Sequence, residues 1–88
     1  MSVETLPPHW IRSAAGITRE FPFSSYADGV AFALRVALLA EKHDHHPDAL
    51  TIGWQKVTIT YITHSAGGVT QLDLEAAQQV DQLYVQQA

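Results

Sequence analysis

The sequence contains no cysteine, few basic residues and no long apolar run. Without cysteine, neither a disulfide framework nor a thiolate metal site can stabilise the fold. Five lysines and arginines stand against nine acidic residues and form no cluster, so we expect no direct binding of nucleic acid. The longest near-continuous apolar run, residues 30–40, is interrupted by Arg35 and is too short to cross a bilayer, so we expect no membrane partner.

A chain of 88 residues has room for one small domain, which we place at residues 10–88, after an irregular arm at residues 1–9 that contains Pro7 and Pro8. A domain of this size buries only about 60% of the surface that its unfolded chain exposes, so we expect self-association to add stability. The first residues lack the basic start and apolar core of a signal peptide, which favours a soluble, cytoplasmic protein.

Hydrophobic periodicity divides the domain into four strands and two helices. Ser24 and Ser25 offer an N-cap for a first helix, which must end before Pro47 because a proline biases its predecessor away from helical geometry. Thr70 and Asp73 have capping-box spacing at the start of a second helix. We expect strands at 10–13, 17–23, near 50–52 and at 56–63, and helices at 25–43 and 71–86. The order ββαββα predicts an α+β fold, with a four-stranded antiparallel sheet and helices packed on one face.

The two predicted helices differ in their apolar surfaces. The first is apolar over most of its circumference, since its polar residues form only a narrow stripe, and we expect it to be buried on more than one side. One of these sides suits contact with another subunit. On the second helix we expect an apolar face made by Leu72, Ala76, Val80, Leu83 and Tyr84. Arg19 shares the parity of an apolar strand face, so it either pairs with a carboxylate or lines a pocket.

Histidine is the residue type in excess, with five in the chain and three between residues 43 and 46. Its unperturbed pKa lies nearest neutrality of all side chains, so these residues concentrate proton-transfer capacity in one segment. They belong to a longer pattern: Glu41, three residues, His45-His46-Pro47, six residues, Trp54, nine residues, His64, eight residues, Asp73.

This multi-point spacing resembles that of the pterin-4a-carbinolamine dehydratases. The segments 40–42, 63–70 and 17–23 also resemble the helix end, the strand-to-helix turn and the second strand of that family, and the match runs from about residue 10 to residue 84. Two departures lie near the N-terminus. The family's N-terminal helix is expected to be shortened or absent here, and His9 stands where the family commonly has glycine before the first tryptophan.

The resemblance implies a hydro-lyase that converts 4a-hydroxytetrahydropterin (pterin-4a-carbinolamine) to quinonoid dihydropterin and supports tetrahydropterin recycling. General acid–base catalysis by histidine would perform it, so no cofactor and no metal are expected. By the same resemblance His45 and His64 form the proton-transfer pair, while His46 mainly binds substrate. Glu41 and Asp44 would orient histidines or meet polar edges of the pterin, Trp54 would supply an apolar wall for the flat ring, and Asp73 completes the binding set.

Other interpretations of the same residues remain open. Asp73 is explained equally well by helix capping, and Glu41 by a solvated helix end. His43, His45, His46 and His64 could supply nitrogen ligands to a metal, although two adjacent histidines suit one metal poorly. A non-enzymatic dimerisation cofactor or assembly chaperone on the same fold is the main alternative function, and another pterin could be the substrate. The resemblance to this family also implies a homodimer or homotetramer.

Overall fold

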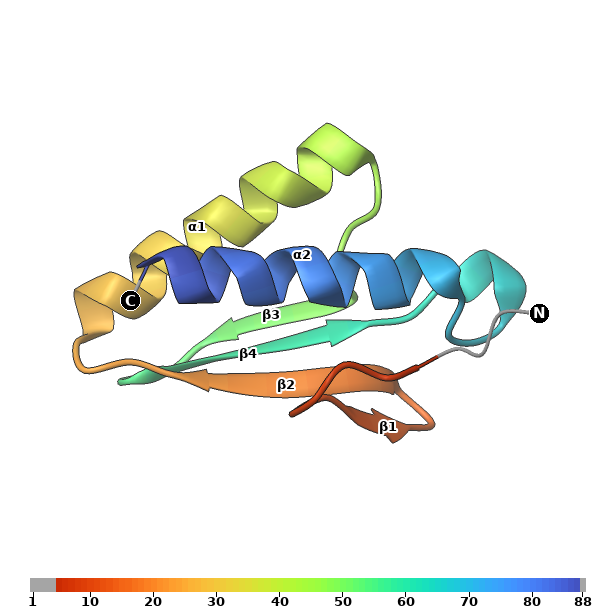
Figure 1. Ribbon diagram of the computed structural model, residues 1–88, viewed down its shortest axis with the longest axis horizontal. Coiled ribbons are helices and arrows are strands. Elements are labelled where there is room, and N and C mark those ends of the chain that lie inside the picture. The colour runs from red at the N-terminus through yellow and green to blue at the C-terminus, as the bar shows by residue number, and fades with distance from the viewer. Residues whose placement is uncertain (1–4, 88) are drawn as a thin grey trace.

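The computed structural model describes residues 5–87 and confirms the predicted order ββαββα (Figure 1). Strands β1 (Ile11–Ser13) and β2 (Gly16–Pro22) precede helix α1 (Tyr26–His43). Strands β3 (Ala49–Ile52) and β4 (Lys56–Tyr61), a short 3₁₀ turn η1 (His64–Ala66) and helix α2 (Gln71–Gln87) follow. All strand pairs are antiparallel, in the order β1-β2-β4-β3. The α+β class and the antiparallel sheet are thus confirmed.

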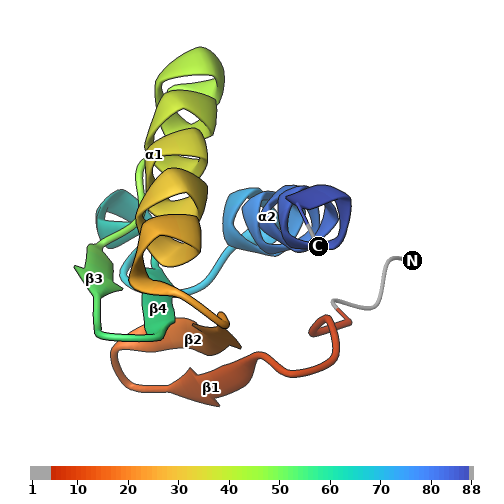
Figure 2. The same ribbon diagram turned by 90° about the vertical axis from the view of Figure 1, so that its left-hand side faces the viewer.

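Both helices lie on the same face of the sheet, as Figures 1 and 2 show. Alternation on the two central strands produces this arrangement, because Ile17 and Phe21 on β2 and Val57, Ile59 and Tyr61 on β4 all point into the core. The opposite parity of the same strands carries threonine and charged residues, namely Thr18, Glu20, Lys56, Thr58 and Thr60. Helix α1 adds Phe32, Ala33, Val36 and Ala40 to the core, and α2 adds Leu74, Ala76, Ala77 and Val80.

The ends of α1 follow from local chemistry. Ser25 is the N-cap and accepts a hydrogen bond from the Asp28 amide at 3.1 Å, as the sequence predicted. At the other end, Asp44 adopts the left-handed conformation and returns its amide to the Ala40 carbonyl, which turns the chain out of the helix. The His45-His46 pair therefore follows this turn, immediately after the end of α1.

Several expectations about the surface need correction or refinement. Ala76 and Val80 are buried as predicted, but Leu72 is half exposed, because Leu74 and Ala77 complete the buried face of α2. Leu34 and Leu38 on α1 are also exposed, which agrees with an apolar side that the chain itself does not cover. Arg19 pairs with the carboxylate of Asp81 at 2.8 Å, one of the two roles predicted for it.

The segment before β1 contains no helix within the described residues, which begin at residue 5. Trp10 lies in the core rather than in β1, and its indole donates to Asp81 at 2.9 Å. Residues 1–4 of the predicted arm lie outside the described residues. Among residues 5–87, no helix has the length and apolar character needed to cross a membrane.

Candidate active site

His45 is held by a buried carboxylate at the start of α2. Its Nε2 lies 2.7 Å from Oδ1 of Asp73, a side chain with no exposed surface. A carboxylate can only accept, so Nε2 carries the proton in this contact and Nδ1 is left as the nitrogen available for chemistry. The sequence separates these residues by 28 positions, and only the packing of α2 against the end of α1 brings them together.

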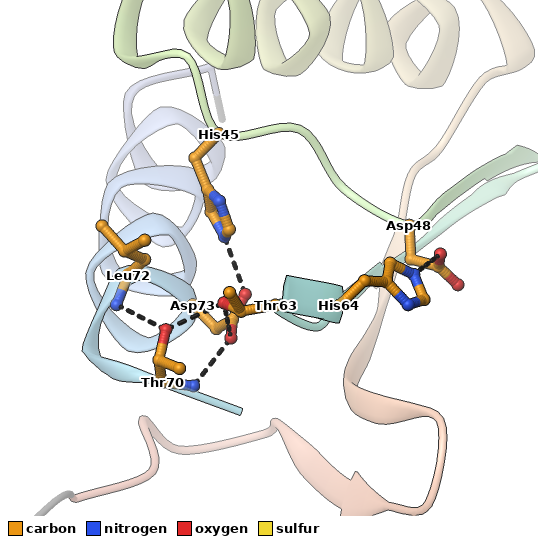
Figure 3. A network of polar contacts seen from close by, with 7 residues as sticks. All are labelled: His45, Asp48, Thr63, His64, Thr70, Leu72 and Asp73. Carbon is orange, nitrogen blue, oxygen red and sulfur yellow. Dashed lines mark hydrogen bonds and ion pairs between the residues drawn. The ribbon is translucent and has the colours of Figure 1, made fainter. Parts of the chain in front are cut away.

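Asp73 is both a helix cap and a partner of His45. Its second oxygen accepts from the Thr70 amide and from the Thr63 hydroxyl, each at 2.8 Å (Figure 3). The Thr70 contact is one half of the predicted capping box. Three donors therefore satisfy a carboxylate that would be costly to bury alone. Capping is compatible with holding His45, because the two oxygens serve different partners, whereas the substrate contact predicted for Asp73 has no exposed oxygen to use.

His64 has a separate carboxylate partner, which the sequence analysis missed. Its Nε2 lies 2.6 Å from Oδ1 of Asp48, and the Asp48 amide donates to the Thr60 carbonyl at 2.8 Å. Figure 3 shows the His45 ring pointing to Asp73, while the His64 ring points to Asp48 on the other side of η1. The sequence signal for Asp48 was its place after His46-Pro47, next to a cluster already singled out.

His46 and Glu41 form the third histidine–carboxylate contact, with 2.5 Å between Nε2 and Oε2. Both side chains are at least half exposed, so the contact contributes little to stability. Asp44 is exposed in the left-handed turn between them. Since Asp48 follows His46 by two residues, all three imidazoles lie around one end of the sheet, where α1 ends and β4 leads into η1.

A hollow of about 120 Å³ lies beside His45, between the end of α1 and the start of α2. Its lining combines apolar Leu39, Ala40, Leu72 and Ala76 with His43, His45, Tyr61, Glu75 and Gln79. His46 and His64 do not line it. The three imidazoles therefore share one end of the domain, but only His45 faces this particular hollow.

Trp54 lies apart from the histidines. It belongs to the turn between β3 and β4, at the opposite end of β4 from His64, and its side chain is 77% exposed. The structure does not bring it near the imidazoles of the same chain. Within residues 5–87, no group of three or more histidine, aspartate or glutamate side chains is arranged to hold a metal ion.

Tyr61 is a residue of the site that the sequence analysis did not identify. Its ring stacks on the His45 imidazole, with 5.7 Å between centroids and 15° between planes. Burial, and then the charge of Asp73, raise the pKa of Tyr61 to about 12, so the phenol stays protonated at neutral pH. Tyr61 shares the buried side of β4 with Val57 and Ile59, but nothing in the sequence indicated the histidine as its neighbour.

The fold and the site together define a class: a small α+β domain that presents three carboxylate-bound histidines at one end of its sheet. The family model for pterin 4 alpha carbinolamine dehydratase matches residues 1–83. The chain belongs to this family.

Relatives and solved structures agree with this assignment. A protein of Natronomonas pharaonis named "Putative pterin-4-alpha-carbinolamine dehydratase" is 46% identical over 78 residues, 89% of this chain and 84% of that one. A protein of the same name from Mycolicibacterium smegmatis is 40% identical over 76 residues, 86% of this chain and 80% of that one.

Two solved structures share the fold. The transcriptional coactivator/pterin dehydratase of Brucella melitensis matches with a TM-score of 0.80 and 34% identity, over 88% of this chain and 83% of that one. A pterin dehydratase-like protein described as a RuBisCO assembly factor in the alpha-carboxysome matches with a TM-score of 0.71 and 27% identity, over 85% of this chain and 86% of that one.

Proposed function

We propose that this chain dehydrates 4a-hydroxytetrahydropterin to quinonoid dihydropterin. In this reaction the bond from carbon 4a to its hydroxyl oxygen breaks, and the oxygen takes a proton and leaves as water. The adjacent ring nitrogen loses its proton and forms a double bond to carbon 4a. The two proton transfers are general acid and general base steps, each typically worth about 10²–10⁴-fold in rate.

The observation that supports this function is the pairing of all three histidines with carboxylates. Each Nε2 is bound, by Asp73, Glu41 or Asp48, so each imidazole keeps Nδ1 for a substrate. A histidine oriented by a carboxylate is a common arrangement for acid–base catalysis, since the carboxylate selects the tautomer and stabilises the charged form. The residues of the three pairs come from α1, from the loop after it, from η1 and from the start of α2, and these segments meet at the same end of the sheet.

We assign His45 and His64 to proton transfer and His46 mainly to substrate binding. In this proposal Glu41 orients His46, Asp73 orients His45, and exposed Asp44 is assigned to a polar edge of the pterin. Trp54 was predicted to supply a wall for the ring. It lies at the other end of β4 from His64, so it cannot line the same pterin site within one chain.

The test is a dehydration assay with His45→Ala and His64→Ala. Each variant is expected to lose most of the activity while remaining folded, and His64→Ala should leave stability within about 0.5 kcal/mol because the side chain is largely exposed. His9→Asn is a matched control. It removes a histidine that lies outside the cluster of His45, His46 and His64, and asparagine tolerates the left-handed conformation of residue 9. Activity unchanged in both site variants would eliminate the mechanism.

A second candidate function is protein assembly. The RuBisCO assembly factor shares this fold, and Leu34 and Leu38 leave an apolar side of α1 exposed, as such a role requires. The same surface would also serve the homodimer or homotetramer that we propose. Analytical sizing of wild type and of Leu34→Glu/Leu38→Glu separates the outcomes: loss of self-association assigns this side to copies of the chain. A monomeric wild type with no pterin turnover would favour the assembly role.

A further inference from the structure

We propose that Tyr61 is a positioning residue for His45, and that its ring holds the imidazole at the tilt in which Nδ1 can serve the substrate. The inference rests on the proposed dehydration for its catalytic consequence. The ring contact itself can be tested without any turnover.

The contact supplies what the hydrogen bond to Asp73 lacks. A bond at Nε2 fixes one atom of the imidazole, but the ring can still tilt about that atom. Tyr61 presents its face to the imidazole at 15° from parallel, which removes that freedom. His45 lies in a segment without regular structure, between Asp44 and Asp48, so its backbone alone provides little orientation.

Tyr61 is itself rigidly held. It is the last residue of β4, pairs with Ile17 of β2, and has 1% of its surface exposed. On another side its ring meets Trp10, with 6.3 Å between centroids. Gly16 permits this close strand contact, because a Cβ at that position would lie 2.2 Å from the Tyr61 carbonyl oxygen. The well-packed core therefore restrains the imidazole through its contact with the Tyr61 ring.

The environment of the phenol agrees with this arrangement. Asp73 acts on both partners, as the hydrogen-bond acceptor of His45 and as a charge near Tyr61. Tyr61 and His45 also line the hollow between the helices. Because the phenol remains protonated, it adds no second negative charge beside the histidine. The contribution we infer therefore belongs to the ring and not to the hydroxyl.

Two substitutions separate ring from hydroxyl. Tyr61→Phe keeps the stacked ring and should retain kcat within about twofold. Tyr61→Leu keeps an apolar side chain but no ring face, and kcat should fall by about tenfold, with KM changed less than twofold, since loosened orientation affects the chemical step. Phe32→Leu is the control for general core damage, because Phe32 is fully buried and packs on Phe21, Phe23 and Tyr84.

Proton NMR of the imidazoles provides the independent readout. The His45 ring protons should resonate upfield of those of exposed His64 in wild type and in Tyr61→Phe, and should lose that ring-current shift in Tyr61→Leu. This comparison remains valid in wild type and Tyr61→Phe even if Tyr61→Leu fails to fold. It also distinguishes the two proposals, because absent turnover in wild type refutes the dehydratase, while an absent shift refutes the stacking.

The proposal is overturned if Tyr61→Leu retains wild-type kcat, if Phe32→Leu lowers kcat as much as Tyr61→Leu does, or if Tyr61→Phe also loses about tenfold in kcat. It is supported if kcat and the His45 shift are lost together in Tyr61→Leu and kept together in Tyr61→Phe.

Discussion

Asp73→Asn is the substitution whose effect follows most directly from the geometry. Asparagine keeps the shape of the side chain but replaces one acceptor oxygen by a donating amide. The Thr70 backbone amide can only donate, so the remaining oxygen must stay toward Thr70. The new NH₂ group then faces Nε2 of His45, which has to accept. The imidazole proton is thereby forced onto Nδ1, the nitrogen that wild type keeps for the substrate.

Two magnitudes follow. Hydrogen bonds to charged groups contribute about 1.5–3 kcal/mol each, so the altered contact should lower the free energy of unfolding by roughly 2 kcal/mol. In a small domain this corresponds to a Tm decrease on the order of 10 °C. The wrong tautomer at a catalytic histidine should lower kcat by at least about 100-fold, since a comparable substitution in a serine protease costs about 10⁴-fold.

The assays are urea unfolding, dehydration of 4a-hydroxytetrahydropterin and ¹⁵N NMR of His45, which reports the protonated nitrogen directly. Asp48→Asn is the matched control, because His64 and Asp48 are both solvated and can reorient, so its stability should change by less than about 0.5 kcal/mol. An Asp73→Asn protein that keeps more than half of the wild-type kcat, or keeps the proton on Nε2, would refute the reasoning.

Three further substitutions test the packing around the site. The pKa of Tyr61 is raised from 10.0 to about 12, because the fold disfavours the ionised phenol. The free energy of unfolding is therefore unaffected below pH 10 and falls as the pH rises from 10 to about 12. That loss amounts to roughly 3 kcal/mol, and Tyr61→Phe should lack it in unfolding measurements across this window. His9→Gly should raise stability by about 1 kcal/mol, since His9 has a φ of 76°, and an unchanged Tm would contradict this strain. Gly16→Ala should destabilise by more than about 2 kcal/mol, because its Cβ meets the Tyr61 carbonyl, and near-native urea unfolding would disprove that close approach.

Features that depend on neighbours along the chain were predictable from sequence. Alternation located β2 and β4, Ser25 and Thr70 marked both helix starts, and Pro47 limited α1. Each rests on a local rule, either the period of a strand or the hydrogen-bonding demand of a helix end. The histidine spacing extends over a longer stretch, from Glu41 to Asp73, but it was also readable in the sequence and resembled the family that the comparisons show.

Features that depend on contact between distant segments were not predictable in the same way. Asp48 is the partner of His64 because β3, which follows Asp48, pairs with the end of β4, which precedes His64. Tyr61 contacts His45 because the chain leaves α1 next to the last residue of β4. The distance between Trp54 and His64 is a different case, because one strand lies between them in the sequence and holds its two ends apart.

The amino-acid sequence by itself determined which elements form, where they begin and which residues can exchange protons near neutral pH. The tertiary structure alone decided which carboxylates bind His45 and His64 and which aromatic ring lies against His45. The physical reason is that periodicity and capping act over a few residues, whereas the partners of a side chain are set by how sheet and helices pack.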